Sequence, residues 1–311
     1  MRSSKGMVMV EKDVLIIGCG PAGMAASIWC SDLGLSHFAL EKEDSTGGQL
    51  HKIYNPITNY PGIRSIAARD LAGSFAEQVT AMGGEMRASS SVISVDGSSL
   101  TAELASGEKL WAKAIVLATG VRRRRLDLPG EAELRGVLES GAKQAAETAG
   151  ARVAIVGGGD AAFENALILS KYASEVTLIH HSDRFRARAE FLDPVRRDPK
   201  IKIIESTVVR ELVGEKGDLK EIGLDGKNGT QRIPTDFLLV RIGVAPNSEL
   251  VKGFVNLDAK RYVITDATCE TGVEMVFAIG DVASPLSPTI ATAVGQAATA
   301  IKVIKMRLAK S

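Results

Sequence analysis

Three glycines near the N-terminus, Gly18, Gly20 and Gly23, have the spacing with which a backbone binds the pyrophosphate of a dinucleotide. The first glycine permits a tight turn, the second lets the phosphates approach the backbone, and the third lets the following helix pack closely on the strand. The phosphates then lie at the positive end of that helix, where N–H groups have no intrahelical partner. Glu41 follows eighteen residues after Gly23, where an acidic side chain accepts hydrogen bonds from ribose hydroxyls.

The segments around these residues have the pattern of a βαβ unit that would position them. Residues 13–17 are an apolar strand, residues 24–33 an apolar, Ala-rich helix, and residues 36–40 a second strand that ends at Glu41. A lone glycine motif also occurs in plain strand-to-helix turns. The flanking strands and the terminal acid favour a dinucleotide site.

A second unit of the same kind begins at Gly157, 139 residues after Gly18 (157 minus 18). Gly157, Gly159 and Ala162 form a variant of the motif between an apolar strand at 153–156 and a helical stretch at 163–169. A further strand is predicted at 175–179. Two such units in one chain indicate two dinucleotides, or a flavin and a nicotinamide nucleotide.

The segments outside the two units repeat as well. Short alternating segments at 92–104 and 206–224 predict two hairpins, and buried strands are predicted at 114–120, 237–242 and 275–281. Asp281 ends the last strand, where it could accept hydrogen bonds from a ribityl chain or simply cap the next helix. We therefore expect an α/β fold of two doubly wound, three-layer Rossmann-like domains, the second inserted in the first: a flavin domain at 1–120 and 245–311, and a nicotinamide domain at 121–244.

Composition narrows the function further. Net charge is +1 and aromatic residues make up 5%, which does not favour nucleic-acid binding, and no apolar run is long enough to span a membrane. The first ten residues lack the apolar core of a secretory signal. Three widely spaced cysteines and four histidines without ligand spacing predict neither a disulfide framework nor a metal site, which fits the cytoplasm.

These motifs, taken together, resemble the low-molecular-weight thioredoxin reductases and the ferredoxin–NADP reductases of the same fold, within the class-II pyridine nucleotide-disulfide oxidoreductases. The segments that carry the resemblance are residues 18–23, 47–50, 59–62, 118–120, 129–131, 157–162, 185–187 and 280–281. The resemblance implies a homodimer with FAD in the outer domain and a pyridine nucleotide in the inserted one, brought together by domain rotation.

The resemblance also implies the residues that contact each cofactor, and implies flavin-centred chemistry without a catalytic protein side chain. For FAD these are Gly18, Gly20, Pro21, Ala22, Gly23, Glu41, Lys42, Gly48, Gln49, Leu50, Tyr54, Asn59, Ala118, Thr119, Gly120, Gly280, Asp281, Thr289 and Ile290. For NAD(P) they are Gly157, Gly158, Gly159, Asp160, Ala161, His180, His181, Ser182, Arg186, Ile242 and Gly243.

One departure from the thioredoxin reductases decides the chemistry. Their redox-active C-x-x-C-Asp would fall, without gaps, on Ser140, Lys143 and Gln144. A disulfide relay needs two thiols and a nearby acid, and these residues supply neither. Electrons must then leave the flavin for a non-thiol acceptor.

A second departure concerns the choice of nucleotide. NADPH-using relatives place two adjacent arginines after a histidine at the end of the second strand, and here His181 and Ser182 replace them. Arg186 matches a third basic residue of the family, and Arg184 could substitute. NADPH is therefore expected, with NADH possible, and a solvated basic loop is the alternative.

Tyr54 lies four residues after Leu50, the spacing at which the ferredoxin-reductase branch stacks a tyrosine on the flavin. The chain stops 30 residues after Asp281 (311 minus 281), without that branch's C-terminal extension. We expect ferredoxin or flavodoxin as acceptor, with the basic stretch 122–125 meeting an acidic carrier or serving only as a linker. The alternatives are an NAD(P)H diaphorase or quinone reductase, and a flavin-binding sensor without turnover.

Overall fold

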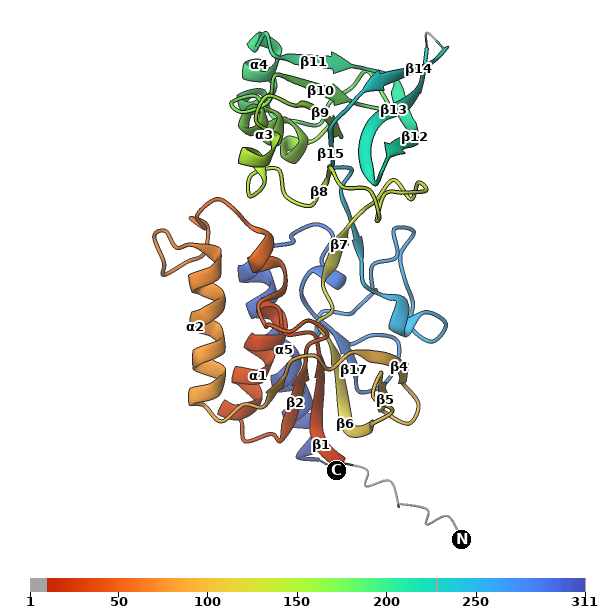
Figure 1. Cartoon of the computed structure of the whole chain (residues 1–311). Helices are drawn as coiled ribbons and strands as arrows, with labels where there is room; N and C mark the ends of the chain where they lie inside the picture. Colours follow the sequence, from red (N-terminus) through yellow and green to blue (C-terminus); the bar gives the residue numbers. More distant parts are fainter. Residues whose placement is uncertain (1–9, 228, 311) are drawn as a thin grey trace. The chain divides into compact units, whose positions relative to one another are not determined.

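The computed structural model describes residues 10–227 and 229–310, which form two compact units (Figure 1). One unit runs up to Arg122 and resumes at Ala245, and the other spans Arg123–Val244. The two chain crossings, β7 (Val121–Arg123) and β16 (Val244–Pro246), pair with each other. Each unit contains a parallel sheet, so the α/β class is confirmed.

The first unit is built on parallel strands whose carboxyl ends meet at one edge. In spatial order these are β3 (Met86–Arg87), β2 (His37–Leu40), β1 (Val10–Ile17), β6 (Lys109–Leu117) and β17 (Val276–Ala278). The first half of β6 also pairs with an antiparallel hairpin, β5 (Thr101–Leu104) and β4 (Val92–Asp96). The long strand β6 therefore belongs to both the parallel part and the antiparallel part of the sheet.

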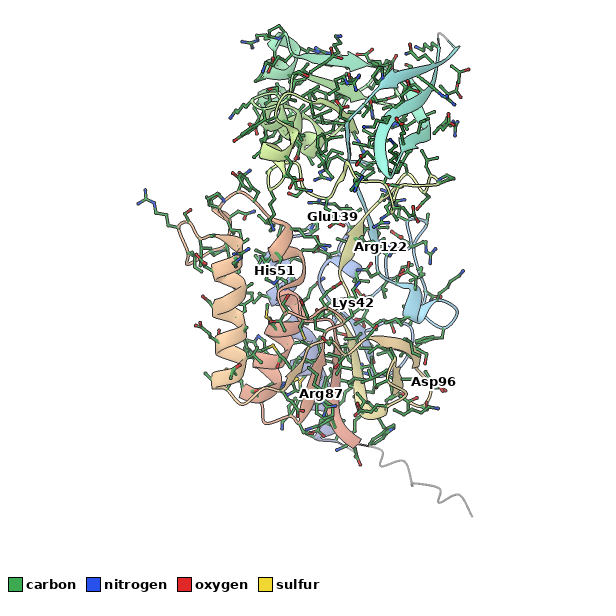
Figure 2. All side chains as sticks on the ribbon, viewed as in Figure 1. Lys42, His51, Arg87, Asp96, Arg122 and Glu139 are labelled. Carbon is green, nitrogen blue, oxygen red and sulfur yellow. The ribbon has the colours of Figure 1, made fainter. Side chains whose placement is uncertain are left out.

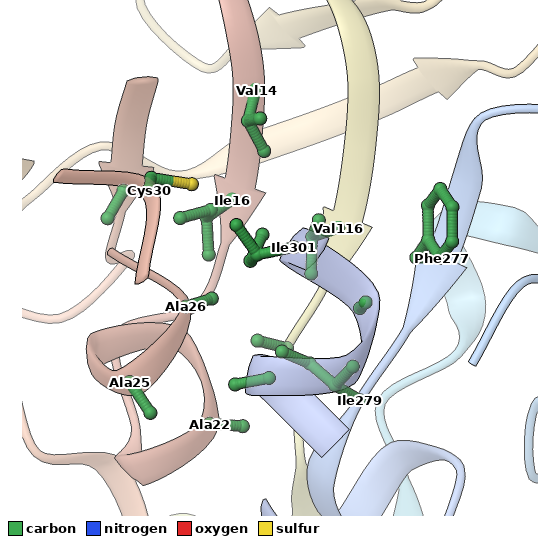
Figure 3. Close-up of a cluster of buried hydrophobic side chains, with 14 of the residues drawn as sticks. Val14, Ile16, Ala22, Ala25, Ala26, Cys30, Val116, Phe277, Ile279 and Ile301 are labelled. Atoms are coloured by element: carbon green, nitrogen blue, oxygen red, sulfur yellow. The ribbon is translucent and has the colours of Figure 1, made fainter. Parts of the chain in front are cut away.

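Alternation along β1 and β6 assigns the two faces of this sheet. Val14, Ile16 and Val116 pack on α1 (Pro21–Asp32) and α5 (Ile290–Leu308), as Figure 3 shows. The alternate residues Leu15, Ile17 and Leu117 pack against β4, β5 and the chain after Ala245. The remaining helix of this unit, α2 (Ala68–Ala81), packs on α1. Burying a side chain of this size stabilises the fold by roughly 1.5–3 kcal/mol, so the period of two determines the layers.

The second unit repeats this design. Its parallel sheet has the order β11 (Ile201–Ile204), β10 (Glu175–Ile179), β9 (Arg152–Val156), β15 (Phe237–Val240) and β8 (Val137–Leu138). Ile155 and Leu178 face α3 (Asp160–Leu169) and α4 (Ala189–Arg197). Ala154 and Ile179 face an antiparallel sheet of β12 (Thr207–Glu215), β13 (Asp218–Gly226) and β14 (Gly229–Pro234).

The hairpin expected at 206–224 is confirmed as β12 and β13, and β14 adds a third strand that the sequence did not predict. Most of β14 is exposed, so its sequence has no alternation of apolar and polar residues to reveal a strand. Short 3-10 helices occupy Gly48–Lys52 (η1), Ala145–Thr148 (η2), Glu249–Val251 (η3) and Gly280–Val282 (η4). Within the described chain, no helix combines the length and apolarity that crossing a bilayer requires.

Candidate dinucleotide sites

In the glycine turn after β1, a side chain at Gly18 or Gly23 would clash with the backbone, whereas a side chain at Gly20 would not. A Cβ on Gly18 would lie 2.4 Å from the carbonyl oxygen of Ala118, and one on Gly23 would lie 1.8 Å from that of Gly18. Gly20, by contrast, has an extended backbone (φ −75°, ψ −173°), and a Cβ there would meet no atom within 4 Å. The open space lies at the N-terminus of α1, where a pyrophosphate fits.

Glu41 lies beside this turn at the end of β2 and is buried. One carboxylate oxygen accepts a hydrogen bond from the Cys19 N–H (2.9 Å) and the other from the Glu43 N–H (3.1 Å). A carboxylate oxygen has two lone pairs, so each retains capacity for a ribose hydroxyl. The neighbouring Lys42 has an exposed side chain that pairs with Glu43 at 3.3 Å.

The loop that contains Gly48 is tied to the same turn. The Gly47 N–H donates to the carbonyl of Cys19 (2.8 Å), and a Cβ on Gly48 would lie 3.2 Å from the Cα of Gly20. Leu50 is buried, and the Gln49 amide donates to the carbonyl of Val121 (2.7 Å). This loop therefore lies next to the open space at Gly20.

Tyr54, just beyond this loop, is 63% exposed. Its ring is therefore available to stack on a planar ligand.

The ends of β6 and β17 complete the edge. The Ala118 N–H donates to the carbonyl of Ile17 (2.8 Å), and Thr119 exchanges two hydrogen bonds with Asn247, at 2.7 and 2.8 Å. A Cβ on Gly280 would lie 2.8 Å from the Cβ of Ala22, so the Gly-Asp turn adjoins α1. This brings together the strand ends that the sequence predicted, including Gly120.

Asp281 is the acidic side chain at this edge that lacks a hydrogen-bond partner among the described residues. It is half-buried, and burial raises the pKa of its carboxyl above the ordinary value. A carboxylate in this state would gain from hydroxyl donors. The site thus fits the ribityl chain expected from the sequence.

Two side chains that the sequence did not predict support this site. Gln296 of α5 accepts hydrogen bonds from the Gly280 N–H (2.7 Å) and the Ser284 hydroxyl (3.0 Å). Its signal was a long polar residue within an Ala-rich helix. Asn247 follows the second chain crossing, and no local pattern connects it with Thr119, 128 residues away.

Other predicted residues lie at the margin of the site. Thr289 is the N-cap of α5 and accepts a hydrogen bond from the Thr292 N–H (3.1 Å), with Ile290 next to it. Asn59 is exposed in a loop closed by the Ile57–Ile66 bridge. Its contact with FAD remains a prediction.

The glycine turn after β9 likewise combines glycines at which a Cβ would clash with one glycine at which it would not. A Cβ on Gly157 would lie 2.3 Å from the carbonyl oxygen of Arg241, and one on Gly158 would lie 2.3 Å from the ring of His180. Gly159 again has an extended backbone (φ −108°, ψ 178°) and no atom within 4 Å of a Cβ. A second open space thus lies at the N-terminus of α3, next to the exposed Ala161.

In the loop after β10, His180 and Ser182 contact the loop's own backbone, and His180 also packs on the glycine turn. The buried His180 ring packs on Gly158 and lies 3.1 Å from the carbonyl of Arg184, and burial, followed by the His181 charge, lowers its pKa. The Ser182 hydroxyl also donates to the Arg184 carbonyl (3.1 Å). His181, Arg184 and Arg186 are the exposed side chains of this loop that could contact a 2′-phosphate.

Asp160 and Gly243 are also engaged within the unit. The carboxylate of Asp160 accepts hydrogen bonds from the Arg188 N–H (2.8 Å) and Nε (2.6 Å), which lowers its pKa. The Gly243 carbonyl accepts from the Arg124 N–H (3.0 Å), next to Ile242. These contacts hold the turns that frame the open space at Gly159.

Comparison with known proteins identifies the family. The sequence profile of the pyridine nucleotide-disulphide oxidoreductases matches residues 12–300. The chain belongs to this family. It is 33% identical to the thioredoxin reductase of Listeria monocytogenes over 91% of this chain and 89% of that one. It is 32% identical to a 34.2 kDa protein in the rubredoxin operon of Clostridium pasteurianum, covering 93% and 95%.

The structure of Lactococcus lactis thioredoxin reductase in its FR conformation superposes with a TM-score of 0.84 at 28% identity, covering 96% of this chain and 100% of that one. The likeness confirms the two Rossmann-like domains expected from the sequence.

This oxidoreductase has no pair of thiols to carry a disulfide relay. All three of its cysteines are described, free and buried. Burial raises the pKa of Cys19 to about 12 and that of Cys269 to about 11, and it raises the pKa of Cys30 as well. Such thiols remain protonated at neutral pH and are poor nucleophiles.

The segment 139–144, where the resemblance places the relay, is a turn held by Gln144. Its side-chain oxygen accepts hydrogen bonds from the N–H groups of Glu139 (3.0 Å) and Ser140 (3.1 Å). The Ser140 hydroxyl in turn accepts from the Lys143 N–H (3.3 Å). These residues stabilise a turn and supply no redox chemistry.

The basic stretch 122–125 is less available than its sequence suggests. Arg122 forms an ion pair with Glu249 at 2.7 Å, and the guanidinium of Arg124 donates to the carbonyl of Val244 (2.9 Å). Arg123 donates to the carbonyl of Glu139. Three of the four guanidinium groups are thus held within the chain, which weakens the idea of an acidic-carrier docking patch.

Proposed function

We propose that this protein is an FAD-dependent NAD(P)H oxidoreductase that passes electrons to a non-thiol acceptor. The observation that carries the proposal is shared by Gly20 and Gly159. Each is the middle glycine of its motif, each has a backbone that any residue could adopt, and each leaves open space beside a helix N-terminus. Neither glycine is needed by the chain alone, so a ligand that approaches the backbone explains both.

The proposal assigns FAD to the unit at 1–120 and 245–311, and the nicotinamide nucleotide to 121–244. Gly20 and the α1 N-terminus would hold the pyrophosphate, Glu41 the adenosine ribose, and Asp281 the ribityl chain. When bound, the flavin would accept a hydride and release electrons singly or in pairs. The chain's contribution is binding and orientation, which needs no acid or nucleophile of its own.

Two observations favour a one-electron carrier such as ferredoxin or flavodoxin as the acceptor. The buried, protonated thiols leave no route through a disulfide, and Tyr54 exposes an aromatic ring next to the proposed flavin site. One relative is named for its place in a rubredoxin operon, which adds rubredoxin to the carriers to test. A quinone or other small oxidant is the alternative, because the arginine stretch offers little free charge to an acidic carrier.

The remaining parts of the proposal follow from the family. We expect a cytoplasmic homodimer, as the resemblance to thioredoxin reductases implies. NADPH is the expected reductant, with Arg186 and Arg184 as the exposed cations for its 2′-phosphate.

Anaerobic reduction of the bound flavin tests the proposal directly. Stoichiometric NADPH should bleach the flavin absorbance rapidly, and NADH more slowly. A flavin that neither nucleotide reduces would instead support a sensor without turnover.

Turnover with ferredoxin, flavodoxin, rubredoxin and a quinone, each across a series of ionic strengths, then identifies the acceptor class. Thioredoxin reduction should be absent. Thioredoxin reduction that survives replacement of all three cysteines by alanine would contradict the proposed electron path.

A further inference from the structure

Two half-buried arginines of the inserted unit converge on one backbone oxygen without an acidic partner. Arg123 and Arg241 both donate to the carbonyl of Glu139, the latter at 3.2 Å, and Arg241 also donates to the carbonyl of Val240 (2.7 Å). Neither guanidinium has a carboxylate within 4.0 Å among the described residues. Three other arginines of this unit, Arg135, Arg152 and Arg188, by contrast each pair with an aspartate at 2.7 Å or less.

The two positive charges of this pair are not balanced by a paired carboxylate. Burial and the neighbouring Arg123 charge lower the pKa of Arg241 to about 10, and burial lowers the pKa of Arg123 as well. Arginine guanidinium groups stay protonated in proteins at neutral pH, so both carry a charge. The exposed carboxylate of Glu139 partly offsets the lowering of the Arg123 pKa. Among the described residues, no acidic group does the same for the pKa of Arg241. Two like charges held together at a partly buried position favour a bound anion.

The two arginines also lie where ligands commonly bind in this type of fold. Arg241 follows β15 and Glu139 follows β8, and the backbone of Arg241 packs against Gly157 after β9. All three positions lie at the carboxyl edge of the parallel sheet, where α/β folds bind ligands. Glu139 also begins the turn held by Gln144. Figure 2 labels Glu139 at this edge.

We propose that Arg123 and Arg241 form an oxyanion site that binds a phosphate or carboxylate group of a small molecule. Guanidinium groups present paired N–H donors that match the oxygens of such groups. The anion is either a phosphate of the nicotinamide nucleotide or a group on a free anionic acceptor. The inference concerns the inserted unit alone and does not depend on the proposed flavin chemistry.

Calorimetric titration of the full chain at low ionic strength tests the site. The probe is inorganic phosphate, followed by nicotinamide mononucleotide, 2′,5′-ADP and succinate. The variants are Arg123→Met and Arg241→Met, with Arg241→Lys as the conservative change. Arg125→Met, which removes an exposed arginine of the same stretch, is the matched control.

We expect both Met variants to weaken phosphate binding at least tenfold, Arg241→Lys to weaken it less, and Arg125→Met to change it less than twofold. A tenfold loss corresponds to about 1.4 kcal/mol. Weakened mononucleotide binding with unchanged 2′,5′-ADP binding identifies the nucleotide as the source. Weakened succinate binding alone identifies a carboxylate acceptor.

Phosphate affinity that is the same in wild type and in both Met variants would overturn the proposal, as would wild type that binds none of the four probes. Thermal unfolding accompanies each titration, and Arg241→Lys carries the test if a Met variant does not fold. Flavin content and NADPH bleaching of the wild-type protein are measured in parallel. Their absence in wild type would count against the proposed function and not against this site.

Discussion

Replacing Gly20 with valine separates the needs of the fold from those of the cofactor. In the chain alone the new side chain meets open space and an extended backbone. Loss of a glycine N-cap costs roughly 0.5–1 kcal/mol, and the smaller entropy of the unfolded chain returns about 0.4–1 kcal/mol. The free energy of unfolding of the flavin-free protein should therefore change by less than about 0.5 kcal/mol.

Flavin binding should respond very differently. A side chain at Gly20 occupies the space assigned to the pyrophosphate and blocks its charge-assisted hydrogen bonds, worth about 1.5–3 kcal/mol each. Loss of two such bonds weakens FAD binding by at least about a hundredfold. Purified Gly20→Val should be nearly colourless, and FAD titration should confirm the loss.

Gly73→Val is the matched control, because Gly73 lies on the exposed surface of α2 with equally open space. It should retain full flavin content. A stable Gly20→Val protein with wild-type flavin occupancy would refute the placement of the pyrophosphate.

Three further predictions test the remaining parts of the sites. Gly159→Val should slow NADPH-driven flavin bleaching at least tenfold while leaving FAD content unchanged, and unaltered stopped-flow rates would argue against the second site. Arg186→Ala should narrow the preference for NADPH over NADH about ten- to a hundredfold, since a guanidinium–phosphate contact is worth roughly 1.5–3 kcal/mol; equal use of both nucleotides by wild type would exclude this role. Burial raises the folded-state pKa of Asp281 above its ordinary value of 3.8, so the ionised carboxylate destabilises the flavin-free fold as pH rises through that pKa. Asp281→Asn should therefore raise the melting temperature of the flavin-free protein at neutral pH but not below about pH 3.8, and it should weaken FAD binding; a lower melting temperature at neutral pH would contradict the argument.

Local patterns in the sequence determined most of the framework. The glycine spacings, the apolar strands before them and the order of the units all follow from residues near one another in the chain. The absence of a thiol pair followed equally, since Ser140 and Lys143 replace the cysteines of the relay. Such features are readable because strand alternation and tight turns impose their demands within a few residues.

The tertiary structure decided which side chains remain available. It shows Gly20 open and Gly23 closed, although both are glycines of one motif. In the folded chain Arg122 forms an ion pair with Glu249, whereas Arg123 and Arg241 meet at one carbonyl oxygen without a paired carboxylate. Partners of this kind lie 100 or more residues apart in sequence. Their pairing depends on which strand ends the sheets bring to one edge, and no local period in the sequence records that.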